Sequence, residues 1–113
     1  MVDKAIYEQV HQWMEAHKEN MIHDIQRIVR IPSISNPLEE VKPFGAACRQ
    51  AMDEMLQIGR EHGFYTENYE YYVGSIGEKE KNWDDMIGFW NHLDVVPVGE
   101  GWDFEPFGAT RKG

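Results

Sequence analysis

The sequence contains a single cysteine, Cys48, so no disulfide can form within the chain and a zinc site built from several cysteines is excluded. It also contains no apolar run of the roughly 18 residues that a membrane-spanning helix requires. The first residues are polar and contain no apolar core of a signal peptide. We therefore expect a reducing, cytoplasmic location.

Positive charge is also scarce. The chain has 11 Lys and Arg residues against 20 Asp and Glu residues, which gives a formal net charge of -9. Proteins that bind nucleic acid, or the anionic surface of a membrane, do so through clustered basic side chains. The sequence therefore predicts neither a nucleic-acid partner nor a membrane partner.

What is present is the composition of a folded domain. Hydrophobic residues make up 42% of the 113 residues and charged residues 27%. A chain of this length buries roughly two-thirds of its unfolded surface, which is enough for a hydrophobic core. We expect one folded unit and not a disordered tail.

Apolar residues at helical spacing predict three helices in the first half of the chain. These helices are expected over residues 4–18, 21–30 and 44–62. Asp3 and Asn20 are expected to cap the first two at their N-termini. Pro32 is expected to end the second helix, and Gly63 the third.

After Gly63 the sequence becomes rich in aromatic and β-branched residues, which indicates strands. The strands are expected over residues 64–67, 69–76 and 86–90, with a charged turn over 77–85. The last strand is apolar nearly throughout, so it should be covered on both faces. About three helices followed by about three strands predict an α/β fold. The tail, residues 95–113, reads as a loop with no closing element, so we expect the chain to be incomplete.

His92 and Asp94 follow the predicted buried strand and are the candidate site residues. Residues two apart in an extended segment point to the same side, so both side chains can face one cleft beyond the strand. A histidine held by a nearby carboxylate is the usual arrangement around a zinc ligand. The alternative is that His92 is a surface histidine and Asp94 a turn residue, because so short a motif often arises by chance.

The remaining candidates favour structural roles. Four other histidines lie on or at the ends of predicted helices and are expected to be solvated or to contact helix ends: His11, His17, His23 and His62. Cys48 lies on an apolar helical stripe, so we interpret it as a core residue and not a nucleophile. Three aromatic residues of the tail, near glycine and proline, are expected to pin down a loop, with the lining of a cleft as the alternative: Trp102, Phe104 and Phe107.

Three segments together resemble the dinuclear zinc metallopeptidases, and the resemblance extends over nearly the whole chain. They are residues 28–35, residues 36–74 and residues 91–107, the last containing Asn91-His92-Leu93-Asp94-Val95-Val96-Pro97. That family includes aminoacylases, carboxypeptidase G and acetylornithine deacetylase. The segment over residues 36–74 is most similar to the PepV-type dipeptidases. One departure is Asn91, where the family usually has glycine.

The resemblance implies that residues 1–113 are the N-terminal part of a zinc-peptidase-like catalytic domain. It implies that His92 binds one of two zinc ions and that Asp94 orients His92. The family's bridging aspartate, its Glu-Glu pair with the general base, its other ligands and its lid domain have no counterpart in these residues.

The resemblance also implies a function. The chain would be a fragment of a dipeptidase that hydrolyses peptide bonds with metal-activated water, and the fragment alone is expected to be inactive. One alternative is a deacylase of N-acyl amino acids, and another is a stand-alone, non-catalytic binding or assembly module. The partners would be a dipeptide or an N-acyl amino acid, and incomplete cover of residues 86–90 would favour self-association.

Overall fold

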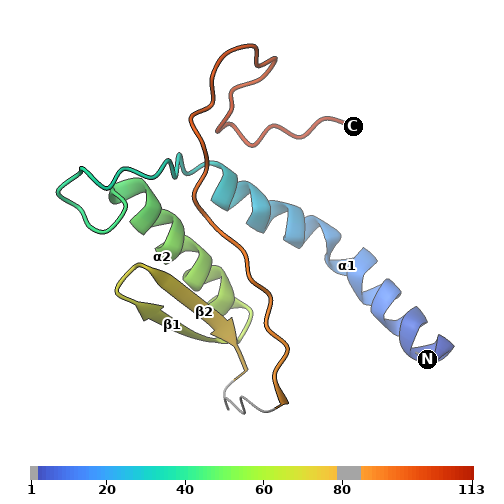
Figure 1. Cartoon of the computed structure of the whole chain (residues 1–113). Coiled ribbons are helices and arrows are strands. Elements are labelled where there is room, and N and C mark those ends of the chain that lie inside the picture. The colour runs from blue at the N-terminus through green and yellow to red at the C-terminus, as the bar shows by residue number, and fades with distance from the viewer. Residues whose placement is uncertain (1–2, 79–84) are drawn as a thin grey trace.

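The computed structural model describes residues 3–78 and 85–113, and in these it contains two helices and a two-stranded antiparallel sheet (Figure 1). The elements, in chain order, are α1 (Lys4–Val29), α2 (Ala46–Glu61), β1 (Tyr65–Tyr69) and β2 (Val73–Gly77). The α/β class predicted from the sequence is confirmed. The numbers of helices and strands differ from those predicted. Two of the predicted helices form one helix, and one of the predicted strands does not form.

The first two predicted helices form one helix, α1, of 26 residues. Asp3 caps it as predicted, because its Oδ1 accepts a hydrogen bond of 2.9 Å from the Ala5 backbone N–H. The predicted break at Asn20 is wrong. Asparagine inside a helix costs less than about 1 kcal/mol, and no glycine or proline stands between Lys4 and Val29 to end the helix. The helix ends before Pro32, as predicted.

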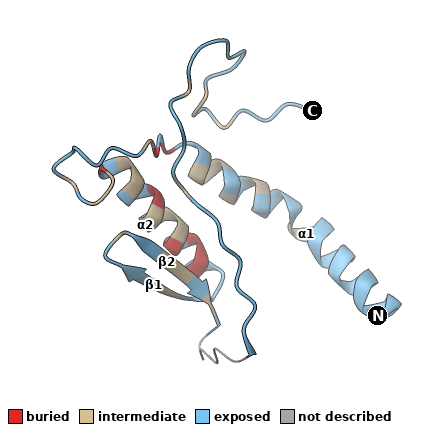
Figure 2. Cartoon of the chain, in the orientation of Figure 1, coloured by how far each residue is buried: buried red, intermediate tan, exposed pale blue. Residues whose placement is uncertain are grey.

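Much of α1 is exposed, and the helix extends away from α2 (Figures 1 and 2). No residue of α1 is buried, and its apolar residues Val10, Trp13 and Met14 are each more than half exposed. The Trp13 ring stacks on the His17 ring with 4.0 Å between centroids. None of the helices in the described residues is both long enough and apolar enough to cross a bilayer.

Ion pairs join the last turns of α1 to α2. The Arg27 guanidinium lies 2.6 Å from a Glu54 oxygen, 2.5 Å from a Glu61 oxygen and 3.3 Å from an Asp24 oxygen. Asp24 also lies 2.8 Å from Nε2 of His62 at the end of α2. The hydrogen bond from His62, and then that from Arg27, lowers the pKa of the Asp24 carboxyl. His62 therefore pairs with a carboxylate of α1.

The helix α2 packs on the hairpin of β1 and β2. Four apolar residues among those described are buried: Ala51, Leu56 and Ile58 of α2 and, from the loop after α1, Ile31. Glycines allow α2 and β2 to approach closely. A Cβ atom added at Gly59 would lie 2.9 Å from Ile76 Cγ2, and one at Gly74 would lie 2.5 Å from Met52 Sδ. Substitution of Gly59 would therefore require the Ile76 side chain to shift, and substitution of Gly74 the Met52 side chain.

The hairpin confirms two of the predicted strands but shortens the second. The strands pair from Tyr65↔Gly77 to Tyr69↔Val73. Glu70 and Tyr71 have φ values of 53° and 61°, and positive φ at both central positions is typical of a type I′ hairpin turn. Residues 70–72, which were predicted to lie in the second strand, therefore form the turn, and Tyr69 ends β1.

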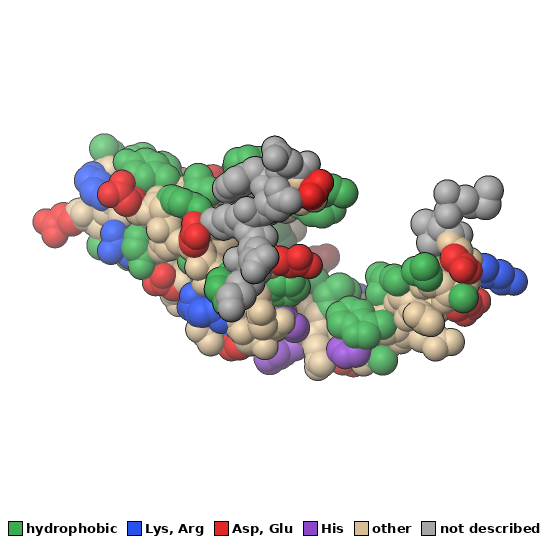
Figure 3. All heavy atoms as spheres, turned by 90° about the horizontal axis from the view of Figure 1, so that it is seen from below, with side chains coloured by type: hydrophobic (Ala, Val, Ile, Leu, Met, Phe, Trp, Pro, Cys, Tyr) green, Lys and Arg blue, Asp and Glu red, His purple; other side chains and the backbone are tan. Residues whose placement is uncertain are grey.

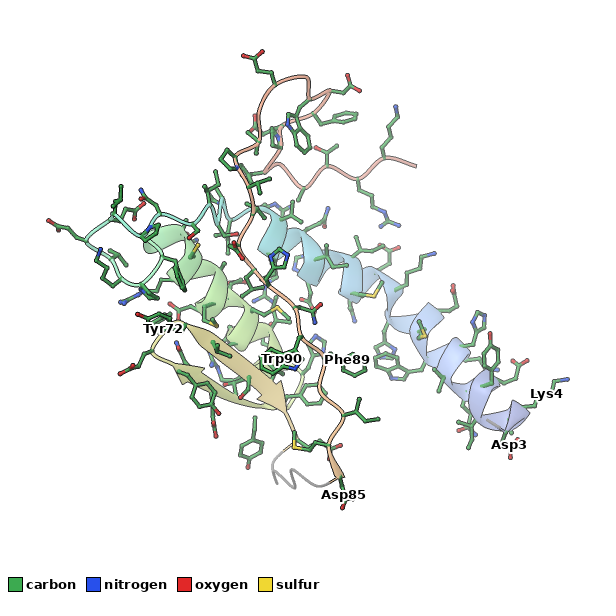
Figure 4. All side chains as sticks on the ribbon, viewed as in Figure 1. Asp3, Lys4, Tyr72, Asp85, Phe89 and Trp90 are labelled. Carbon is green, nitrogen blue, oxygen red and sulfur yellow. The ribbon has the colours of Figure 1, made fainter. Side chains whose placement is uncertain are left out.

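The predicted strand over residues 86–90 is wrong. This segment belongs to no strand, and Ile87, Phe89 and Trp90 are 84%, 88% and 89% exposed (Figure 4). An extended apolar segment becomes a strand only where a neighbour accepts and donates its backbone hydrogen bonds. In the described residues β1 and β2 pair with each other, and neither pairs with this segment. Most of the predicted charged turn, residues 79–84, lies outside the described residues.

Hydrophobic side chains consequently stand on the molecular surface in several places (Figure 3). They belong both to α1 and to the segment that precedes His92. Self-association of the chain through this surface stays a prediction. The tail over residues 95–113 contains no helix or strand, as predicted, apart from an isolated β-bridge at Val95.

Candidate functional site

His92 and Asp94 lie side by side at the end of the extended segment. The His92 Nδ1 atom is 3.2 Å from Asp94 Oδ1 and 2.9 Å from the Asp94 carbonyl oxygen. The two side chains are therefore neighbours, and a metal-binding role for them stays a prediction. In the tautomer that carries hydrogen on Nδ1, this N–H donates to Asp94, and Nε2 keeps the lone pair that a metal would use.

The backbone beside this pair is attached to the loop that follows α1. The Val95 N–H donates a 3.0 Å hydrogen bond to the Ser33 carbonyl oxygen, and the Ser33 hydroxyl donates a 2.6 Å hydrogen bond to the Leu93 carbonyl oxygen. Ile34 and Val95 form an isolated parallel β-bridge. Residues 33 and 34 therefore act as a strand-like neighbour for residues 93–95, which follow His92.

Sequence reasoning missed Ser33. It is 2% exposed, and no other polar residue among those described is buried. The available signal was its place in the segment over residues 28–35, which resembles the metallopeptidases, although that resemblance gives no contact. A hydrogen bond across 60 positions of the sequence has no local pattern that would predict it.

Cys48, in α2, also contacts Ser33. Its Sγ is 3.4 Å from the Ser33 carbonyl oxygen, as a weak donor, and the residue is half-buried. Burial raises the pKa of the thiol, and the negative charges of Asp94 and Glu39 raise it further. A thiol with a raised pKa is a poor nucleophile, which agrees with the interpretation of Cys48 as a packing residue.

Comparison with known proteins gives a consistent set of relatives, although no family model matches the chain. Putative dipeptidase YtjP of Bacillus subtilis is 38% identical over 97 residues, which are 84% of this chain and 20% of that protein. A putative dipeptidase of Staphylococcus haemolyticus is 36% identical over 100 residues, 84% of this chain and 21% of the relative. A third, from Staphylococcus aureus, is 32% identical over 96 residues, 83% of this chain and 20% of the relative.

This chain is similar in sequence to part of these putative dipeptidases. It spans about 20% of the length of the curated relatives that it matches. Because the match to the Bacillus subtilis protein covers 84% of the chain, it includes the segment from His92 to Asp94 wherever in the chain it starts.

The candidate pair is open to solvent. The side chains of His92 and Asp94 are 84% and 56% exposed, so the described residues do not form the cleft that was expected around them. Imidazole nitrogen and carboxylate oxygen are both donors that zinc accepts. The pair therefore fits one corner of a zinc site.

The pair alone is not a complete metal site. A catalytic zinc requires three protein ligands and an open position for water. Over residues 3–78 and 85–113, no group of three or more His, Cys, Asp or Glu side chains is placed to hold a metal ion. The pair could provide at most one corner of such a site, and further ligands would have to come from elsewhere.

A separate shallow hollow of about 640 Å³ lies against the end of α1. Its lining includes Val29, Trp102 and Phe104. The Trp102 indole N–H donates a hydrogen bond of 2.7 Å to the Val98 carbonyl oxygen, which closes the loop between these two residues. Gln26 attaches the tail to α1, because its side-chain N–H donates a hydrogen bond of 2.9 Å to the Ala109 carbonyl oxygen. Trp102 therefore holds its loop in shape, as predicted, and also lines the hollow.

Proposed function

We propose that this chain forms part of a zinc-dependent dipeptidase, in which His92 binds one of two zinc ions and Asp94 orients His92. The observation that carries the proposal is the contact of 3.2 Å between His92 Nδ1 and Asp94 Oδ1. It lies within the stretch that is homologous to the putative dipeptidases. We further propose a cytoplasmic location, on the ground of a single cysteine with no disulfide partner.

The residues of the chain contribute binding and orientation. Asp94 orients the His92 ring and fixes its tautomer, which leaves the Nε2 lone pair available to a metal. Zinc, when bound, would polarise the substrate carbonyl and lower the pKa of a bound water. Since the described residues gather no group of three or more possible ligands, we expect the isolated chain to be inactive.

The substrate class follows from the relatives. Their names as putative dipeptidases support a dipeptide as the substrate, in preference to the N-acyl amino acid of a related deacylase. A deacylase would use the same His92–Asp94 pair, so the pair itself does not distinguish the two reactions. A non-catalytic binding module is the remaining alternative, and the activity of the chimera described below separates it from a partial enzyme.

The isolated chain is expected to bind zinc weakly and to hydrolyse no dipeptide. One imidazole with its carboxylate gives far less affinity than the three or four ligands of a stable site. Calorimetric titration with zinc and a dipeptide hydrolysis assay measure the two properties. Tight stoichiometric binding that is lost in His92→Ala would show that the chain holds a complete site by itself, and would contradict the proposal.

Asp94→Ala is expected to reduce metal affinity and activity by roughly 10- to 100-fold in a complete enzyme, which is the usual effect of losing a residue that orients a ligand. A suitable enzyme is a chimera of the Bacillus subtilis protein in which the matched stretch is replaced by that of this chain. Metal content and dipeptide hydrolysis are measured with and without the substitution. The matched control is Glu40→Ala, which removes an exposed carboxylate of the loop before α2. Equal activity of Asp94→Ala and the parent chimera would remove Asp94 from the proposed site.

A further inference from the structure

We propose that Ser33 is a positioning residue for the His92–Asp94 pair, and that its buried hydroxyl sets the geometry in which His92 meets the Asp94 carboxylate. The inference rests on the proposed function, because it assigns to Ser33 a task in the same site. It starts from an imbalance in exposure. The two site side chains are 84% and 56% exposed, whereas Ser33 behind them is 2% exposed.

Exposed side chains are not held in place by packing. A histidine that is mostly in solvent samples several rotamers unless its backbone and a partner restrict it. The contact of His92 with Asp94 therefore depends on the backbone between the two residues. That backbone is Leu93, whose carbonyl oxygen accepts the 2.6 Å hydrogen bond from the Ser33 hydroxyl.

Two further contacts fix the position of Ser33 itself. Its carbonyl oxygen accepts hydrogen bonds from the Val95 N–H at 3.0 Å and from the Cys48 thiol at 3.4 Å. Ser33 is thus attached to α2 through Cys48 and to the site segment on both sides of Asp94. Ser33 therefore connects α2 to the segment that carries His92 and Asp94.

The hydroxyl can be removed without removing the backbone contact. In Ser33→Ala the Val95 N–H keeps its acceptor, but the Leu93 carbonyl oxygen loses its donor in a half-buried place. A polar group left unpaired in such a place favours local opening. Ser33→Thr keeps a hydroxyl at the same position, so it should restore the hydrogen bond to Leu93.

The test uses the whole chain and NMR spectroscopy at one fixed pH, without metal. In Ser33→Ala we expect the Val95 amide, which donates to the Ser33 carbonyl oxygen, to exchange with solvent roughly 5- to 150-fold faster than in the parent chain. We also expect the fraction of His92 that carries hydrogen on Nδ1 to fall, as read from the ring nitrogen shifts. Ser33→Thr should keep both values near those of the parent. Ser35→Ala removes an exposed hydroxyl two positions away and should change neither value.

Three results would overturn the inference. The first is an unchanged His92 ring in Ser33→Ala, and the second is a Ser33→Thr variant that behaves as Ser33→Ala does. The third is equally faster exchange at Leu56 in α2, which would mean that Ser33 holds the whole fold and not this segment. Because no zinc is present, these results are independent of whether the chimera hydrolyses dipeptides, so failure of the inference and failure of the proposed function are distinguishable.

Discussion

The Leu56→Ala variant is expected to lose about 2–5 kcal/mol of unfolding free energy, which is the usual range for a leucine truncated in a core. Leu56 is 4% exposed and lies where α2 packs on the hairpin. The substitution removes the Leu56 Cδ2 methyl, which packs against Gly74 of β2: a Cβ atom built at that glycine would lie 3.1 Å from it. Since only four apolar residues among those described are buried, the loss of one is a large share of the core. Denaturant unfolding followed by circular dichroism measures the change.

Leu38→Ala is the matched control. It makes the same chemical change at a leucine that is 92% exposed, and substitutions on the surface change stability by about 0.5 kcal/mol or less. If the two variants unfold at the same denaturant concentration, the packing of α2 on the hairpin is not the core of this fold.

His92→Ala is expected to reduce the dipeptidase activity of the chimera to background. The substitution removes the imidazole that is proposed to bind zinc, and a zinc ion with one ligand fewer is held less tightly and no longer in its catalytic geometry. Metal content after dialysis and the rate of dipeptide hydrolysis should fall together. This loss should exceed that of Asp94→Ala, because an orienting residue acts only through the ligand.

His23→Ala is the control for this variant. It removes an imidazole from an exposed position of α1 and should leave metal content and activity unchanged. Full activity in His92→Ala would contradict the assignment of His92 as a ligand, and the His92–Asp94 pair would then be a surface contact.

Local features of the fold were predictable from the sequence. Asp3 was identified as a cap, and Gly63 as the stop after α2, because each depends on residues within one helical turn. Gly63 adopts φ of +81°, the conformation that favours glycine at the end of a helix. Asn20 misled the prediction since a residue that can cap a helix is also tolerated inside one.

Long-range pairing was not predictable in the same way. The apolar character of residues 86–90 predicts a strand, but a strand also needs a neighbour, and the sequence does not say which segment that is. The bridge forms instead between Ile34 and Val95. For the same reason the pair His92 and Asp94 could be predicted, because both lie in one extended segment, whereas the support from Ser33 could not.

The attachment of α1 to α2 near one end only divides the helix into two parts of different stability. Arg27 and Asp24 join its last turns to α2, while every residue over positions 3–16 is exposed. An isolated helix shorter than about 12–15 residues is marginal in water, so the first turns must form and open largely on their own. They can unwind while the α2–hairpin core stays folded, and the two parts belong to separate cooperative units. A protease that requires an unfolded segment would therefore reach the start of α1 without any unfolding of the core around Leu56.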